Sequence, residues 1–95
     1  MHTYFKPAEE IRDIGRPISG TTFADLTDAL GDGEVIFQLL KRPDHVFYAV
    51  LIQAPETFAE FAHLAQRDDF TSDGYFAVPW SDAEDGTDEP VEKWT

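Results

Sequence analysis

The sequence predicts an α+β domain: a small antiparallel sheet built on a central β-hairpin, with two or three short helices packed around it. The chain has 95 residues, which is enough for one domain with a single core. Two runs rich in Val, Ile, Leu, Phe and Tyr predict the hairpin, at about residues 34–41 and 45–53, and an Arg-Pro-Asp turn separates them. We expect three or four strands, with a helix at residues 55–67 on one face of the sheet.

The first helix is expected to follow a short strand within the opening stretch YFKPAEEIRDIG. Pro7 suits the first turn of a helix, where its missing N–H is not needed, and Gly15 is a natural stop. Ile11 and Ile14 are three positions apart, so we expect both to face inward.

The second helix is predicted to begin after Thr21 or Thr22, because either hydroxyl can act as an N-cap. Its apolar residues recur at helical spacing: Phe23, Leu26 and Leu30. Gly31 suits the position just past the end of the helix, where a left-handed backbone is common.

The second strand of the hairpin is apolar on both faces. One face carries Val46, Tyr48, Val50 and Ile52, and the other carries Phe47, Ala49 and Leu51. Such a pattern is typical of a central strand that is covered on both faces, or of a strand that leaves one face for a partner.

The helix at residues 55–67 has the clearest signals. Pro55 suits its first turn, and its apolar positions follow one face: Phe58, Phe61, Ala62 and Ala65. Residues 71–74 (TSDG) then indicate a turn. A short last strand follows, in which Pro79 limits pairing to the edge or the end of a sheet.

The last part of the chain has the composition of a solvated tail. Residues 81–95 contain six acidic residues and one lysine, a balance of 1 − 6 = −5. Trp80 is the last residue that we expect to contact the core. We therefore place a single domain at residues 1–80 and an acidic, flexible tail at residues 81–95.

The net charge of the whole chain is −12, from 19 acidic residues against 7 lysines and arginines. Such a field opposes phosphates, so we expect no direct binding to nucleic acid and none to anionic membranes. The N-terminus lacks a signal-peptide pattern, and no apolar stretch approaches the roughly 18 residues of a membrane span, so we expect a soluble, cytoplasmic protein. The absence of cysteine excludes disulfides and thiolate metal sites.

The sequence contains no catalytic or cofactor-binding motif, so we expect neither an enzyme nor a cofactor. An EF-hand frame with Gly86 in the sixth position lacks two of the required carboxylates, and a frame ending at Trp80 lacks the final glutamate. The histidines have no metal-ligand spacing: they are His2, His45 and His63. We therefore expect no metal site.

Carboxylates in three series are the candidate partner-binding residues. They lie on and after the second helix, on and after the third helix, and in the tail: Asp25, Asp28, Asp32 and Glu34; Glu56, Glu60, Asp68 and Asp69; Asp82, Glu84 and Asp85. Between residues 17 and 90 only Lys41, Arg42 and Arg67 offset them. Solvated faces are the simplest interpretation of such rows. Because dense like charges cost stability, however, the pattern favours either adaptation to high salt or a surface for a basic partner.

In size, acidity and lack of cysteine, the chain is similar to the small phage-encoded inhibitors of bacterial defence, such as anti-CRISPR and anti-restriction proteins. Several of those proteins imitate DNA with their carboxylates. The similarity is one of overall character, covers no aligned segment and assigns no residue a role. It implies a non-catalytic inhibitor that blocks a basic nucleic-acid-binding site on another protein, and this is the function we expect.

Two other functions stay open. In a structural or housekeeping domain of a salt-adapted organism, the acidic layer would serve solubility. A small ligand-binding domain would instead use a pocket between the sheet and a helix, and a homodimeric interaction module would use exposed aromatic residues as anchors. The aromatic residues that either fill the core or form such an interface are Tyr4, Phe5, Phe70, Tyr75, Phe76, Trp80 and Trp94.

Overall fold

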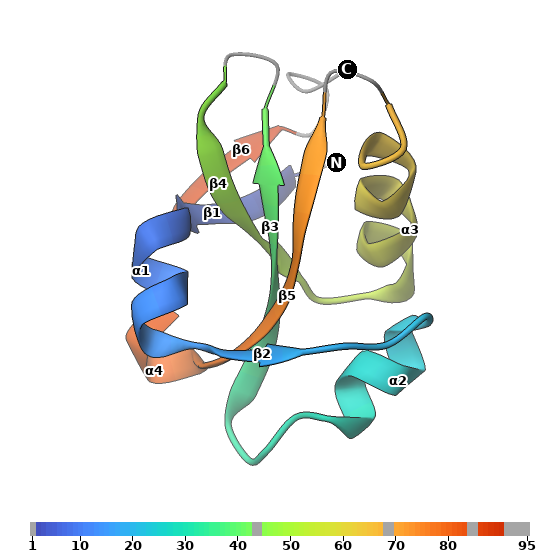
Figure 1. Ribbon diagram of the computed structural model, residues 1–95. Helices are drawn as coiled ribbons and strands as arrows, with labels where there is room; N and C mark the ends of the chain where they lie inside the picture. The colour runs from blue at the N-terminus through green and yellow to red at the C-terminus, as the bar shows by residue number, and fades with distance from the viewer. Residues whose placement is uncertain (1, 43–44, 68–69, 84–85, 91–95) are drawn as a thin grey trace.

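The computed structural model describes residues 2–42, 45–67, 70–83 and 86–90, which form six strands and four helices (Figure 1). The strands are β1 (His2–Pro7), β2 (Arg16–Ile18), β3 (Glu34–Lys41), β4 (Phe47–Ile52), β5 (Thr71–Pro79) and β6 (Thr87–Pro90). The helices are α1 (Ala8–Ile14), α2 (Phe23–Asp28), α3 (Pro55–Leu64) and α4 (Trp80–Ala83). All strand pairs are antiparallel, in the order β2-β5-β3-β4-β1-β6. The α+β class is confirmed, but the sheet is larger than the predicted three or four strands.

The predicted hairpin is present, formed by β3 and β4. Its register aligns Ile36 with Ile52 and Lys41 with Phe47. At the turn, the Arg42 N–H donates to the Val46 carbonyl at 2.9 Å. Two residues of the expected turn, at positions 43 and 44, lie outside the described residues.

Both faces of β4 are buried, because helices cover both faces of the sheet. Figure 1 shows α2 and α3 on one side of it and α1 and α4 on the other. The core under α2 and α3 contains Phe5, Leu26, Ile36, Leu40, Val50, Ile52, Phe61, Leu64 and Phe70. The core under α1 and α4 contains Ala8, Ile11, Phe37, Leu39, Ala49, Leu51, Val78 and Ala83. Among the described helices, none is long and apolar enough to cross a membrane.

The strand β5 differs most from the prediction. Residues 71–74, expected to form a turn, begin a nine-residue strand that lies inside the sheet between β2 and β3. The turn-like residues instead form an irregularity in the β3–β5 register, and Gly74 has a φ of +93° that an L side chain rarely adopts. Pro79 is the last residue of β5, which agrees with the prediction that it lies at an edge or an end.

Only part of the predicted inward pair in α1 is correct. Ile11 is fully buried, whereas Ile14 is 37% exposed. The reason is the length of the helix: α1 contacts the sheet through Ala8 and Ile11, one turn apart, and ends at Ile14. The backbone then turns at Gly15 into β2, so the last residue of the helix lies beyond the buried stripe.

The second helix begins as predicted and ends earlier than its apolar spacing suggests. Thr22 is the N-cap: its hydroxyl accepts from the Asp25 N–H at 3.2 Å, and the Asp25 carboxylate accepts from the Thr22 N–H at 3.3 Å. This reciprocal pair is a capping box. The helix ends at Asp28, so Leu30 lies in the connection to β3.

The N-cap gives a first prediction. Replacing Thr22 by alanine is expected to lower the free energy of unfolding by about 1 kcal/mol, because the N–H that the hydroxyl accepts loses its partner. Urea denaturation would measure the difference. Thr22→Ser keeps the hydroxyl and should stay near the native value, and an equal loss in both variants would contradict a capping role.

The segment expected to be a tail contributes to two elements. Residues 80–83 form α4, where the Ala83 side chain is fully buried, and residues 87–90 form β6, which pairs with β1. The described part of this segment therefore extends the sheet past residue 80. Residues 84, 85 and 91–95 lie outside the described residues, and with them Trp94.

The other aromatic residues that the sequence left between core and interface are mostly inward. Phe5 and Phe70 are buried, while Tyr4, Tyr75 and Phe76 are half-buried against the two cores. Trp80 is 38% exposed and packs beside Tyr4 with 5.7 Å between the ring centroids.

Candidate functional site

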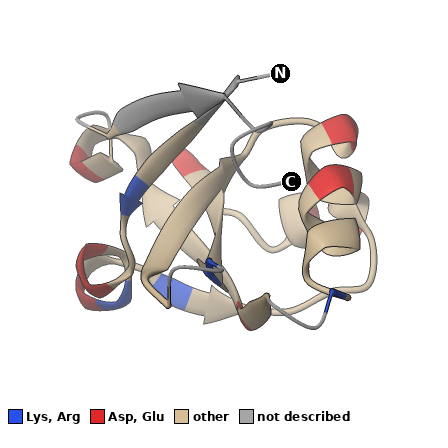
Figure 2. Cartoon of the chain, turned by 90° about the horizontal axis from the view of Figure 1, so that it is seen from above, with Lys and Arg blue, Asp and Glu red and all other residues tan. Residues whose placement is uncertain are grey.

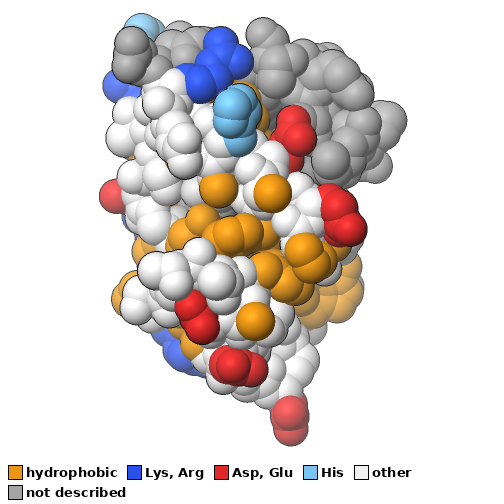
Figure 3. Space-filling view, turned by 90° about the vertical axis from the view of Figure 1, so that its right-hand side faces the viewer, with side chains coloured by type: hydrophobic (Ala, Val, Ile, Leu, Met, Phe, Trp, Pro, Cys, Tyr) orange, Lys and Arg blue, Asp and Glu red, His pale blue; other side chains and the backbone are white. Residues whose placement is uncertain are grey.

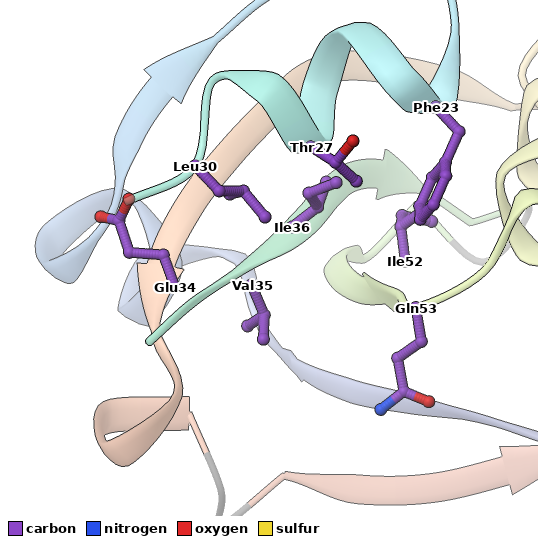
Figure 4. A pocket seen from close by; sticks show the side chains of 8 residues that line it. All are labelled: Phe23, Thr27, Leu30, Glu34, Val35, Ile36, Ile52 and Gln53. Carbon is purple, nitrogen blue, oxygen red and sulfur yellow. The ribbon is translucent and has the colours of Figure 1, made fainter. Parts of the chain in front are cut away.

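An apolar pocket lies between α2 and the ends of β3 and β4, with a volume of about 190 Å³ (Figure 4). It is lined by Phe23, Thr27, Leu30, Glu34, Val35, Ile36, Ile52 and Gln53. In Figure 4, Thr27, Leu30 and Ile36 lie close together, and the Phe23 ring extends from α2 toward Ile52. Most of the pocket wall is therefore aliphatic or aromatic, with Glu34 and Gln53 at its two ends.

A row of three aromatic rings holds α2 and α3 on the same face of the sheet. The ring centroids of Phe23 in α2 and Phe58 in α3 are 6.4 Å apart. Phe58 is in turn stacked on Tyr75 of β5, with 5.8 Å between the ring centroids. Burial raises the pKa of the Tyr75 hydroxyl above its usual value. Because two helices and a strand contribute to one row, the position of α2 beside the pocket depends on packing as well as on its own short sequence.

An ion pair fixes the other end of the pocket. The Glu34 carboxylate accepts from two nitrogens of Arg16, at 2.6 and 3.3 Å, and from the Gly31 N–H at 2.6 Å. Arg16 also donates to the carbonyl of Ala29 at 2.8 Å. This group, which we call the Arg16 clamp, joins β2, the start of β3 and the connection after α2.

The clamp makes stability depend on pH. Hydrogen bonds from Arg16 and from the Gly31 N–H lower the pKa of Glu34 below its ordinary value. A carboxyl group whose pKa is lowered on folding stabilises the fold above its unfolded pKa, and this contribution is lost as the pH falls through the folded pKa. Glu34→Gln is therefore expected to be less stable than the native protein at pH 7 and to lose less stability on acidification.

Thermal melts from pH 7 down to pH 3 would measure this difference. Glu56→Gln is a matched control, because Glu56 is exposed and makes no ion pair among the described residues. Parallel pH profiles for the native protein and Glu34→Gln would contradict the role given to the clamp.

The predicted site residues fall into three groups, and the first is committed to contacts within the chain. Asp25 accepts from the N–H and hydroxyl of Thr21 and from the N–H of Thr22, and these bonds lower its pKa. Glu34 belongs to the Arg16 clamp. Both carboxylates support local structure, which the charge pattern of the sequence does not reveal.

The second group consists of carboxylates on the surface. Asp28, Asp32 and Glu56 are exposed and Glu60 is half-exposed, and within the described part of the chain none of them makes an ion pair. Figure 3 views the side of the molecule on which α2 and α3 lie, and it shows a band of hydrophobic side chains with acidic side chains on both sides. We call this surface, formed by α2, α3 and the pocket between α2 and the sheet, the α2–α3 face.

Of the remaining predicted residues, one lies on the opposite side of the sheet and four lie outside the described residues. Asp82 is exposed on α4, which covers the opposite face of the sheet. Asp68, Asp69, Glu84 and Asp85 lie outside the described residues. Figure 2 shows that acidic positions also occur on α1, at the opposite side of the molecule from those of α3.

The positive charges contrast with these free carboxylates. Lys6 is buried and pairs with Glu10 at 2.9 Å, Arg12 pairs with Asp73, and Arg16 pairs with Glu34. Three arginines lie over aromatic rings: Arg12 over Phe47, Arg42 over Tyr48 and Arg67 over Phe70. Two of the four arginines, Arg12 and Arg16, are thus paired with carboxylates, whereas the stacked Arg42 and Arg67 keep their positive charge.

A second hollow, of about 390 Å³, lies beside α1 and the start of β4. It is lined by Pro7, Ala8, Glu9, Arg12, His45, Val46 and Phe47. Its one guanidinium, of Arg12, is already paired with Asp73 and packed on Phe47, so it is not free to bind an anion. In the described ranges, no cluster of three or more His, Asp or Glu side chains is arranged to hold a metal ion.

The sequence left open a ligand-binding domain with a pocket between the sheet and a helix, but it assigned no residues to that pocket. Phe23 and Leu30 were predicted only as apolar positions of a helix, and Ile52 only as an apolar position of a strand. One signal in the sequence could have indicated the pocket. The apolar spacing continues to Leu30, and a helix that ended near Asp28 would leave this side chain in a loop beside the sheet. No family model, curated protein or solved structure matches the chain.

Proposed function

We propose that this protein is a non-catalytic binding protein whose α2–α3 face occupies a basic site on another protein. The observation that carries the proposal is the arrangement of that face: exposed carboxylates on α2 and α3, which make no ion pair with any described residue, lie beside an apolar pocket and a band of hydrophobic side chains. In its specific form, the protein is an inhibitor that competes with nucleic acid for a lysine- and arginine-rich groove.

Electrostatics supports this form of recognition. A field of one sign accelerates the encounter with a surface of the opposite sign and selects against acidic partners. The net charge of −12 provides such a field, and Arg12 and Arg16 are already paired with carboxylates of the same chain. Because salt screens exposed charges within about 10 Å at 0.1 M, binding should weaken steeply as salt is added.

Competition with nucleic acid follows from the same charges. Sites that bind nucleic acid gain much of their affinity from contacts between lysine or arginine and phosphates. A protein that presents carboxylates to those side chains can occupy them without binding nucleic acid itself. The apolar band between the carboxylates would add contacts that phosphates do not make, and it would slow dissociation.

Charge reversal on the α2–α3 face tests the proposal. The partner would be captured at low salt from an extract of the source organism, identified by mass spectrometry and purified. The variants Asp28→Lys/Asp32→Lys and Glu56→Lys/Glu60→Lys are each expected to weaken its binding by about tenfold or more and to flatten the salt dependence. Asp25 and Glu34 are left unchanged, because reversing them would also disturb the fold.

The matched control is Glu9→Lys/Asp13→Lys on α1, which changes the net charge equally at exposed positions on the other side of the molecule. The native protein should also displace a labelled nucleic acid from the captured partner. Equal affinities for the native protein and both α2–α3 variants would contradict the proposal. So would a fold that needs molar KCl for stability, because the acidic layer would then serve solubility in high salt.

A further inference from the structure

We propose that the pocket between α2 and the sheet holds one aliphatic side chain from a basic segment of the partner. This inference rests on the proposed function and adds what the partner must carry: a residue such as leucine or isoleucine with lysine or arginine close to it in sequence. The first support is the size of the pocket. Its 190 Å³ is below the roughly 300–1,000 Å³ of sites for cofactors and drug-sized ligands, so a single side chain fits better than a small molecule.

The chemistry of the wall points to the same occupant. Phe23, Leu30, Ile36 and Ile52 supply apolar surface from a helix, a connection and two strands. The Thr27 hydroxyl already donates to the Ala24 carbonyl at 2.9 Å, so it does not need a polar group from a ligand. An aliphatic side chain would be removed from water here without leaving a buried polar group unsatisfied.

The charges around the pocket select the neighbours of that side chain. Asp28 follows Thr27 directly in α2, and Asp32 lies between Leu30 and Glu34 in the connection to β3. Both carboxylates are exposed, and neither makes an ion pair among the described residues. Glu34 is neutralised by Arg16, and no lysine or arginine is among the residues that line the pocket. A cation beside the inserted side chain would therefore meet Asp28 or Asp32.

The pocket is held in shape before binding. The Arg16 clamp fixes the connection that follows α2, and the Phe23–Phe58–Tyr75 row fixes α2 against α3 and β5. Preorganisation of this kind reduces the entropy lost on binding. Burying one leucine side chain in a preformed pocket is worth about tenfold to a hundredfold in affinity.

Two synthetic peptides rich in lysine and arginine test the inference. They differ at one central position, which is leucine in the first peptide and serine in the second. The leucine peptide is expected to bind the native protein about tenfold more tightly and to shift the methyl NMR signals of Leu30, Ile36 and Ile52. Isothermal titration at low salt would measure both affinities.

Thr27→Phe is designed to fill the pocket, and Ala24→Phe adds the same ring one turn earlier on α2, outside the pocket lining. Thr27→Phe should bind both peptides with equal affinity, whereas Ala24→Phe should keep the preference for leucine. Thr27 and Ala24 are exposed, so both variants are expected to fold. Thermal melts would check this.

The outcomes separate this inference from the proposed function. One outcome is that the two peptides bind the native protein with equal affinity, and that this affinity falls when Asp28 and Asp32 are reversed to lysine. In that case the pocket does not hold the side chain, but the acidic face still binds basic peptides. If the preference for leucine survives Thr27→Phe, the side chain binds elsewhere and the inference is wrong. If neither peptide binds and charge reversal has no effect on the captured partner, the proposed function itself fails.

Discussion

Replacing Phe61 by alanine is expected to lower the free energy of unfolding by about 3–5 kcal/mol. The Phe61 side chain is fully buried in the core under α2 and α3, between α3 and the sheet. Its removal takes away the transfer free energy of the ring and leaves a cavity that the β-sheet below cannot close. Because a domain of this size is stable by only about 5–15 kcal/mol, the variant should be partly unfolded at 37 °C. Urea denaturation at 25 °C would measure the loss.

Phe58 provides the comparison within the same helix. It is half-buried at the edge of that core, where its ring contacts Phe23 and Tyr75. Phe58→Ala should therefore cost clearly less stability than Phe61→Ala, since solvent already reaches part of the ring and less new cavity is created. If the two variants lose equal stability, α3 does not pack on the sheet in the orientation described.

Phe58→Ala should cost less stability than Phe61→Ala, but it should weaken peptide binding. Phe58→Ala removes the middle ring of the aromatic row, so the ring contact between α2 and α3 would be lost while the fold persists. We expect this variant to bind the leucine peptide more weakly with only a moderate loss of stability. A site that depends on the relative position of two helices can thus be impaired by a residue that does not line the pocket.

Local signals in the sequence account for the parts of the fold that were predicted correctly. The hairpin of β3 and β4 joins two long apolar runs across a short turn, so its pairing needs no information from the rest of the chain. The N-cap of α2 and the start of α3 at Pro55 also depend on neighbouring residues alone. The apolar pattern of β4 predicted either a strand covered on both faces or a strand that leaves one face for a partner, and β4 is covered on both faces.

The strands that were missed are defined by pairing partners far away in sequence. β2 has three residues, one of them proline, and it pairs as a strand with residues 75–77 of β5. β6 consists of the polar sequence TDEP and pairs with β1, which lies at the other end of the chain. Neither segment has the composition of a strand, because its neighbours in the sheet, rather than its own side chains, determine its conformation.

The candidate site was predicted only in part, because some of its contacts also depend on partners far away in the sequence. Acidic residues on α2 and α3 could be read from the sequence, and Asp28, Asp32, Glu56 and Glu60 are at the surface. The sequence could not show that Asp25 and Glu34 are used internally, because their partners are set by a capping geometry and by an arginine on a strand that was not predicted. The pocket requires the end of α2 to meet the ends of β3 and β4, which only the three-dimensional structure shows.

One residue in the core departs from the apolar pattern of β3. Gln38 is 1% exposed and faces the core under α2 and α3, between Ile36 and Leu40. Its side-chain N–H donates to the Ser72 hydroxyl at 3.2 Å, but its carbonyl oxygen meets no hydrogen-bond donor among the described residues. A buried acceptor without a donor costs about 1–3 kcal/mol of stability.

Replacing Gln38 by leucine is therefore expected to raise the free energy of unfolding, by about 1–2 kcal/mol. Leucine has a similar volume and adds no polar atom, while Ser72 is exposed and can exchange its lost bond for one to water. Urea denaturation would measure the gain. Ser72→Ala removes the hydroxyl that accepts from Gln38, and it should change the free energy of unfolding little if that hydrogen bond is not a main source of stability. Gln38→Ala removes the same polar group but also leaves a cavity. Its free energy of unfolding should therefore be lower than that of Gln38→Leu, by more than the hydrogen bond to Ser72 contributes. A loss of stability in Gln38→Leu would contradict this reasoning, because it would mean that the carbonyl oxygen has a donor, such as a buried water molecule, that repays its burial.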